Sequence, residues 1–372
     1  MKEKIKHKVF SKFSTLIVIF AAAIFSVMLI IYSKEVSTAV IASINSCMTV
    51  IIPSLFGFMA VSNIIIKSNI YVWLSKPFYP ISKYILRIPP ELFSVFILSN
   101  IGGYPIGAKL LCELLEEKKI TDTDAESMMC CCFCSGPAFI IGAVGINIFS
   151  SVLTGFIIYI SIVCSNFFIA AIMGLKREIP SSVKKKYNVH FSSDILIESV
   201  SSTIKTLTMI CGMIIFFAVF IQVLKTSQLI VSMSELVSCI GISIENSNSI
   251  ITSIIEISTV SGFSKFAYSF IPVITSLCAF GGICVIIQLS SITNSKIKMK
   301  RFIITRPFQI ILSGAISWVL LNAFSKKIAI MTIYHPVITS ERKSILPTII
   351  LIIMIILLFV KNNSRFLKKG MI

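Results

Sequence analysis

Charged residues are scarce in this chain: Asp, Glu, Lys and Arg make up only 13% of its 372 residues. Hydrophobic residues make up 56%, and the mean hydropathy is +0.94. A soluble domain of this length needs a far more polar surface, so the composition excludes a soluble globular protein. Its apolar runs have the length of membrane helices, and we expect an all-α polytopic membrane protein.

Histidine is almost absent as well. The three histidines, His7, His190 and His335, fall in expected loops or tails. The sequence also lacks a phosphate-binding loop and a nucleophile placed beside a base. We therefore expect no enzymatic activity, no metal and no cofactor.

Acidic residues number 16 against 34 lysines and arginines, which gives a net charge of +18. Such a charge invites a nucleic-acid partner. The basic residues, however, lie in clusters between apolar runs, which is how topology is encoded in a membrane protein. We expect weak attraction to anionic lipid headgroups and no nucleic acid.

The 11 cysteines do not indicate a disulfide framework, because most lie in apolar segments where a free cysteine acts as a small hydrophobic residue. The run Cys130, Cys131, Cys132 and Cys134 has no histidine nearby. On a helix these side chains point in different directions, so we interpret them as helix-packing residues and not as metal ligands.

Eight apolar runs of roughly 20 residues are long enough to cross a membrane. Two further segments are expected to be re-entrant hairpins that return to the side they entered. Segment 91–111 is apolar but broken at Gly102-Gly103 and Pro105, and segment 228–264 contains polar residues such as Glu256. The expected spans are 14–32 (retained as a helix and not cleaved), 37–60, 128–149, 152–174, 204–224, 268–293, 303–324 and 344–361.

Basic clusters predict the topology. If the N-terminus is cytoplasmic, four clusters face the same side, as the positive-inside rule requires, and the C-terminus is cytoplasmic too. Lys326, Lys327, Arg342 and Lys343 then fall outside. The four clusters are Lys2 to Lys12, Lys176 to Lys186, Lys296 to Arg301 and Lys361 to Lys369.

Under this topology the two hairpins enter from opposite sides, so the chain contains an inverted repeat. Inverted repeats with broken helices meeting at the midplane are typical of secondary transporters. The expected parts are a tail and first helix (1–36), a first unit (37–175), a basic linker (176–203), a second unit (204–325), and a C-terminal helix and tail (326–372).

The breaks define the candidate site. Ser135 is expected to cap a half-helix from about Gly136 to Phe149, whose free N–H groups would suit an anion. Gly281 and Gly282 are expected to open the matching helix in the second unit. The predicted substrate-binding residues are Asn100, Gly102, Gly103, Tyr104, Lys109, Ser135, Gly136, Glu256, Ser258, Ser261, Gly281, Gly282 and Gln288.

Structural alternatives exist for these residues. Lys109 fits a lysine that extends to the cytoplasmic interface. Glu256 fits a partner of Lys265 or a water-facing loop residue. The glycines fit close helix packing, and Asn100 and Ser135 fit packing or capping roles.

Three strings resemble one protein family: GGYPIGAKL from Gly102, CSGPAFIIGAVG from Cys134 and AFGGICVIIQL from Ala279. They are similar to the YlbJ-like sporulation integral membrane proteins, which carry a nucleoside-recognition "gate" domain like the core of concentrative nucleoside transporters. The resemblance covers about residues 40–325. The chain departs from the family pattern at Cys130–Cys134 and at Cys284-Val285, where polar residues are expected.

The resemblance implies passage of dipicolinic acid from the mother cell across the outer forespore membrane, in support of spore cortex and core maturation. The residues alone leave open a carrier of nucleosides or other small metabolites, and a non-transporting membrane assembly factor. The expected partners are a small anionic metabolite and the lipid bilayer, and a homo-oligomer is left open.

Overall fold

The computed structural model describes residues 2–71, 73, 76–175, 177, 189, 191–239, 241–262 and 268–334. For 2–14, 17, 90, 261, 262, 268 and 325–334 it describes the backbone alone. Every regular element in these residues is a helix, which confirms the all-α expectation for this part of the chain. Residues 1–328 form one compact unit, and residues 329–372 are a separate one.

Five helical segments are long and apolar enough to cross a membrane, which supports a multi-pass membrane protein. They are Ser33–Lys67, Val152–Gly174, Ser193–Thr226, Ile271–Thr293 and Lys300–Phe324. The expected span 152–174 has the predicted bounds. The first expected span, 14–32, lies within α1 (Lys2–Ile31) except for its last residue, and the last, 344–361, lies outside the described residues.

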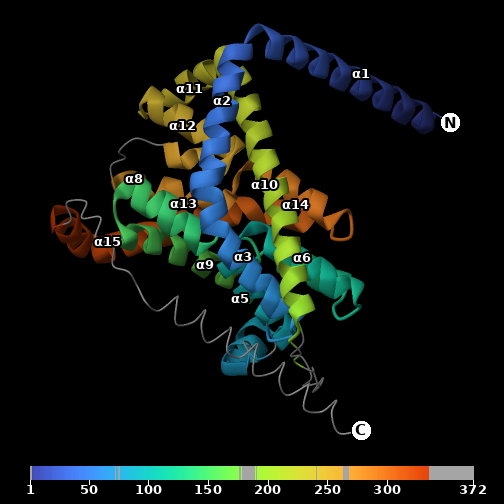
Figure 1. The fold of residues 1–372 in the computed structure, drawn as a ribbon, viewed down its shortest axis with the longest axis vertical. Coiled ribbons are helices and arrows are strands. Elements are labelled where there is room, and N and C mark those ends of the chain that lie inside the picture. The colour runs from blue at the N-terminus through green and yellow to red at the C-terminus, as the bar shows by residue number, and fades with distance from the viewer. Residues whose placement is uncertain are drawn as a thin grey trace. The chain divides into compact units, whose positions relative to one another are not determined.

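One long helical rod runs antiparallel to α10 (Ser193–Thr226). The rod consists of α2 (Ser33–Ser46), a π-helical turn (Cys47–Ile51) and α3 (Ile52–Lys67). Asn63 donates to Thr203 at 2.8 Å, and Lys67 pairs with Glu198 at 2.5 Å. Residue numbers rise along one helix as they fall along the other, so the two run in opposite directions, side by side (Figure 1).

Two helical hairpins flank opposite ends of α10. In the first, α5 (Pro90–Gly102) packs against α6 (Tyr104–Glu116), near the end of α3. In the second, α11 (Leu229–Ser238) packs against α12 (Ile244–Ile255), directly after α10 and near the start of α2 (Figure 1). Hairpins at opposite ends are what an inverted repeat requires, although the repeat itself stays a prediction.

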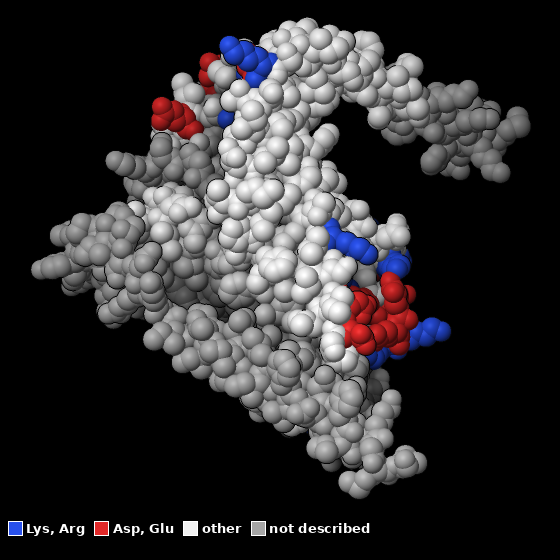
Figure 2. All heavy atoms as spheres, in the orientation of Figure 1, with Lys and Arg blue, Asp and Glu red and all other residues white. Residues whose placement is uncertain are grey.

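Charge is distributed as a membrane protein requires. On the face shown in Figure 2, acidic and basic side chains gather over the ends of α3, α6 and α10 and again beside α11 and the start of α2. The faces of α2, α3 and α10 between these groups carry almost no charge. An uncharged band between two charged ends matches a helix bundle in a bilayer.

The expected span 128–149 is wrong, because the chain there is not one helix. The helix α7 (Asp122–Met129), capped at Thr121 by a capping box, ends before the cysteines, and residues 130–136 are irregular. Gly136 has φ +80°, which a continuing helix cannot accommodate. The second part, a π-helix (Ala138–Ile146) followed by the short α8 (Asn147–Phe149), confirms the expected half-helix from about Gly136 to Phe149.

That π-helix packs against α9 (Val152–Gly174) backbone to backbone. A Cβ atom on Gly145 would lie 2.6 Å from Cα of Gly155, and one on Gly155 would lie 2.8 Å from Cα of Ile141. Only residues without side chains allow this approach.

The remaining elements surround these hairpins. They are two helical turns (Lys76–Phe78 and Ile81–Leu86), two 3₁₀ turns (Ile257–Gly262 and Tyr268–Phe270), α13 (Ile271–Phe280), α14 (Gly282–Thr293) and α15 (Lys300–Tyr334).

Candidate functional site

Chain breaks from both halves of the molecule meet at one cavity of about 60 Å³, which is lined mostly by buried residues and which we call the central cavity. This volume admits a few water molecules. Apolar side chains of the rod, the π-helix, α10 and α14 form much of its wall. Seven of the thirteen predicted site residues line it: Gly102, Gly103, Tyr104, Ser135, Glu256, Ser258 and Gln288.

The first break lies between α5 and α6. Gly103 has φ +94° and ψ 175°, a region that only glycine occupies readily, and Pro105 follows in the first turn of α6. A Cβ on Gly136 would lie 3.3 Å from Cα of Gly103, so the two breaks of the first half are in backbone contact. The sequence predicts this break correctly.

The second half repeats the arrangement with different residues. Gly281 and Gly282, with φ +80° and +83°, separate α13 from α14, so Gly282 opens α14 as expected. A Cβ on Gly282 would lie 3.0 Å from the backbone nitrogen of Ile257, just after α12 ends. In the first half, the glycine before the π-helix thus packs against the break between α5 and α6. In the second half, the glycine that opens α14 packs against the chain at the end of α12 and just after it.

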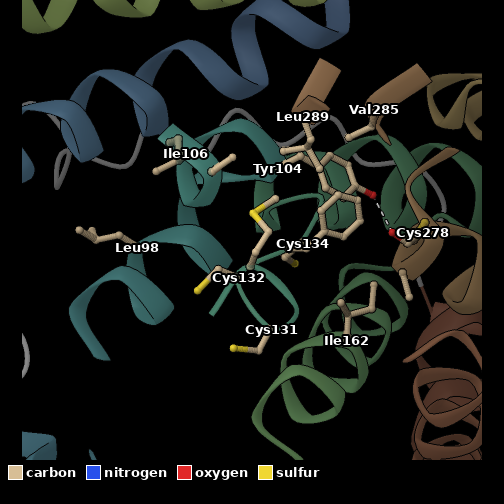
Figure 3. Close-up of a cluster of buried hydrophobic side chains, with 14 of the residues drawn as sticks. Leu98, Tyr104, Ile106, Cys131, Cys132, Cys134, Ile162, Cys278, Val285 and Leu289 are labelled. Atoms are coloured by element: carbon tan, nitrogen blue, oxygen red, sulfur yellow. Dashed lines mark hydrogen bonds between the residues drawn. The ribbon is translucent and has the colours of Figure 1, made fainter. Parts of the chain in front are cut away.

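Tyr104 joins the two halves. Its hydroxyl donates to the carbonyl of Cys278 at 2.6 Å (Figure 3). The same hydroxyl contacts the Ser135 hydroxyl. Ser135 donates to the same carbonyl at 3.2 Å. The carbonyl is exposed to these donors because it belongs to the last turn of α13, where carbonyls have no partner within the helix.

The expected capping role of Ser135 is therefore wrong. Its side chain makes no capping bond to the π-helix, which follows Pro137. The hydroxyl is instead occupied by Tyr104 and Cys278, and this leaves no described side-chain cap at the start of the π-helix.

Glu256 is the acidic residue in the described lining of the central cavity, and it is 2% exposed. One carboxyl oxygen, Oε1, accepts from the Ser258 backbone N–H at 3.0 Å. The other, Oε2, has no hydrogen-bond donor of ordinary geometry among the described residues. The Cys284 thiol is a neighbour of the Glu256 carboxyl, and its sulfur accepts from Gln288 Nε2 at 3.3 Å.

Glu256 also lines a second cavity. This distal cavity, of about 320 Å³, is lined by the polar residues Lys225 and Asn248 near the second hairpin. Ile214, Glu256 and Ser258 line both cavities, so Glu256 lies at their junction.

Lys109 does not line the central cavity. Its ammonium group donates to Asn63 Oδ1 at 3.3 Å and to the Ser202 hydroxyl, which ties α6 to α3 and α10. Nearby Lys67, Glu113 and Glu198 border another cavity of about 430 Å³. The described lining of the central cavity therefore contains a carboxyl group and no lysine or arginine.

Other predicted residues do not line the central cavity but pack around it. Asn100 is buried and accepts from Asn166 at 2.8 Å while it donates to the carbonyl of Phe96. Gly281 lies against the rings of Tyr104 and Phe133. The Ser261 side chain and the whole of Lys265 lie outside the described residues, so the alternative in which Glu256 pairs with Lys265 stays open.

The four clustered cysteines are buried and free, but they lie on irregular backbone and not on the expected helix. Figure 3 shows Cys131, Cys132 and Cys134 pointing in different directions. No group of three or more His, Cys, Asp or Glu side chains in the described part of the chain has a metal-binding arrangement.

Sequence reasoning missed a buried polar network on α15. Arg306 is 3% exposed, lies 4.3 Å and 4.7 Å from the ring centres of Phe302 and Phe133, and donates to the carbonyl of Cys130. Gln309 donates to Asn166. An arginine inside an apolar run, with a glutamine one turn later, is the signal that identifies such a network.

Comparison with curated proteins shows similarity to the sporulation integral membrane protein YlbJ of Bacillus subtilis (strain 168), with 28% identity over 203 residues. The similarity covers 48% of this chain and 49% of the relative, so the chain spans about half the length of the curated relative it matches. It confirms the resemblance to YlbJ-like proteins that the motifs predict. No family model and no solved structure matches the chain.

Proposed function

We propose, from its relation to the YlbJ-like sporulation membrane proteins, that this chain carries a small metabolite across a membrane during spore formation. One observation carries the proposal: a break from each half of the chain borders the same cavity. Broken backbone at membrane depth is tolerated where it lines a cavity, and paired breaks are typical of transporter substrate sites.

Dipicolinate, moved from the mother cell across the outer forespore membrane, is the substrate that the family resemblance implies. It is a small planar dianion. The Tyr104 ring, the Gln288 amide and the backbone at the breaks are the groups available for it. Since no described cation lines the cavity, an anion there depends on neutral donors.

A nucleoside is the second candidate, and a specific observation favours it. Glu256, Ser258 and Gln288 border the cavity together, and a carboxylate, a hydroxyl and an amide suit sugar hydroxyls and base edges. The cavity lining alone therefore does not discriminate between the two substrates.

Counterflow in proteoliposomes tests the proposal. Vesicles with the purified protein are loaded with unlabelled dipicolinate or uridine, and entry of the labelled compound is followed. We expect dipicolinate exchange well above that of protein-free vesicles. Gln288→Leu, which removes a cavity amide, should lower exchange at least several-fold, whereas Gln222→Leu, on α10 away from the cavity, should not.

Each other outcome has a definite meaning. Exchange of uridine alone would identify a nucleoside carrier. Exchange of neither compound by protein that stays folded would favour the assembly factor, as would normal spore dipicolinate in a Gln288→Leu strain.

A further inference from the structure

The carboxyl group of Glu256 lies at the junction of the central and distal cavities. The proposed substrate also carries carboxylates, so like groups would meet there. Glu256 is buried, and its Oε2 atom has no ordinary hydrogen-bond donor among the described residues. Its carboxyl makes no ion pair with a described cation. The groups that donate to the carboxyl are neutral: the Ser258 backbone and hydroxyl and the Cys284 thiol. Without a cation beside it the ionised form is poorly compensated, since a buried charge needs a partner of opposite charge.

The surrounding titratable groups do not supply that partner. Cys284 on α14, Tyr104 on α6 and Cys47 on the rod are neutral neighbours of Glu256, and Cys211 on α10 lies beside Cys47. Lys225 is the charged group that shares the distal cavity with Glu256, and it forms no ion pair in the described structure. Under the predicted topology this lysine lies at the non-cytoplasmic end of α10, the side to which the proposed substrate would leave.

Protonation changes what Glu256 does to a substrate. An ionised carboxylate only accepts hydrogen bonds and repels a dianion, whereas a protonated carboxyl donates one hydrogen bond. Two carboxylates that share a site hold a proton between them, because both cannot stay ionised at close range. A substrate carboxylate beside Glu256 would thus bind together with a proton.

We propose that Glu256 binds a proton that travels with the anionic substrate, which makes the carrier a proton-coupled anion symporter. The proton bonds to a Glu256 carboxyl oxygen from the water on the loading side, and it leaves to water on the far side with the substrate. One dianion and one proton cross in each cycle, so one net negative charge moves. The inference rests on the proposed transport function.

The test measures accumulation of labelled dipicolinate in proteoliposomes whose membrane potential is held at zero with potassium and valinomycin. A gradient of about one pH unit near neutrality, acidic on the side of the substrate, leaves dipicolinate ionised and should raise its accumulation about tenfold for one coupled proton. Glu256→Gln, which is permanently neutral, should lose the effect of the gradient, measured as the ratio of accumulation with and without the gradient at whatever counterflow rate the variant retains.

Matched variants locate the effect. Glu245→Gln removes an exposed carboxyl from the first turn of α12 and should leave gradient-driven accumulation unchanged. Lys265→Gln should also leave it unchanged, and loss of coupling there would overturn the proposal by indicating an ion pair with Glu256. Glu256→Asp, which keeps an ionisable group, should retain coupling.

A measurement on the unchanged protein covers the case in which the Gln variant fails to fold. Dicyclohexylcarbodiimide, an apolar reagent for protonated carboxyls, should label Glu256, and alkaline pH should suppress the labelling. Absence of label at every pH would overturn the proposal. Wild-type vesicles without counterflow would instead refute transport itself, whereas counterflow that ignores the gradient would refute the coupling alone.

Discussion

Tyr104 shows how much one side chain can decide in a helical membrane protein. Its hydroxyl connects the first break to the last turn of α13, and its ring lies 4.4 Å from that of Phe133, measured between centres. The same residue thus borders the cavity and links the two halves. Its effects on binding and on folding must therefore be measured separately.

Tyr104→Phe should destabilise the protein, because the buried carbonyl of Cys278 would keep Ser135 as its remaining described donor. We expect a loss of about 1–2 kcal/mol, the usual cost of removing a buried hydrogen bond. Thermal unfolding in detergent measures it. Tyr159→Phe is the control, since that hydroxyl reaches the Asn100 carbonyl only at 3.4 Å, and an equal effect at both positions would contradict the prediction.

Arg306→Lys should also destabilise, despite conserving charge. The guanidinium lies close to the rings of both Phe133 and Phe302, and a lysine cannot reproduce that planar contact. We expect a cost of about 2 kcal/mol, as for a desolvated cation–π contact. Arg301→Lys, at a half-exposed position, should be nearly silent in the same unfolding assay, and unchanged stability of the Arg306 variant would refute this account.

At the scale of elements, the glycine breaks are the features on which the site depends. Each places two helix ends at the cavity in place of one continuous helix. The glycines at these breaks have positive φ values. The effect of replacing one of them can therefore be distinguished from the effect of replacing a glycine within a helix.

Gly103→Ala should cost roughly 1–3 kcal/mol, since its backbone conformation is nearly closed to other residues. Gly212→Ala makes the same chemical change on an exposed face of α10, where nothing lies within 4 Å of the added atom. It should be neutral or stabilise by up to about 1 kcal/mol. The two unfolding midpoints should therefore move in opposite directions or by clearly different amounts.

The sequence predicts elements well where hydropathy and local conformation agree. Span 152–174 and the break at Gly103 belong to this group. The half-helix from about Gly136 to Phe149 belongs to it too, whereas the single span 128–149 fails, because an apolar run does not show that Gly136 adopts a positive φ. The Ser135 cap fails for a related reason: a partner distant in sequence, Tyr104, occupies the hydroxyl. One ionisable residue inside an apolar run indicates the Arg306 network, but the partners in that network come from three other segments and cannot be predicted from it.

At the scale of the molecule, the proposed topology makes a sharp prediction about the hairpins. Glu117, just after α6, and Glu245, on α12, are exposed and belong to hairpins at opposite ends of α10. Single cysteines at these positions, in a background without native cysteines, should react with membrane-impermeant thiol reagents from opposite sides. Position 117 should be cytoplasmic, on the side of both termini.

Labelling of both positions from one side would remove the inverted repeat. Labelling from opposite sides, but with position 117 outside, would keep the repeat and reverse the assigned orientation. A cysteine in place of Ser182, in the basic linker, gives the reference for the cytoplasmic side, because the positive-inside rule applies to that segment most directly.

The backbone contact between Gly145 and Gly155 has a genetic consequence. The atoms that an added methyl group would meet belong to the main chain, so no neighbouring side chain can be shortened to make room for it. A strain carrying Gly145→Ala should therefore regain full spore formation by reversion at codon 145, and intragenic suppressors should be rare. Variants of cavity side chains, whose neighbours can adjust, should yield second-site suppressors far more readily.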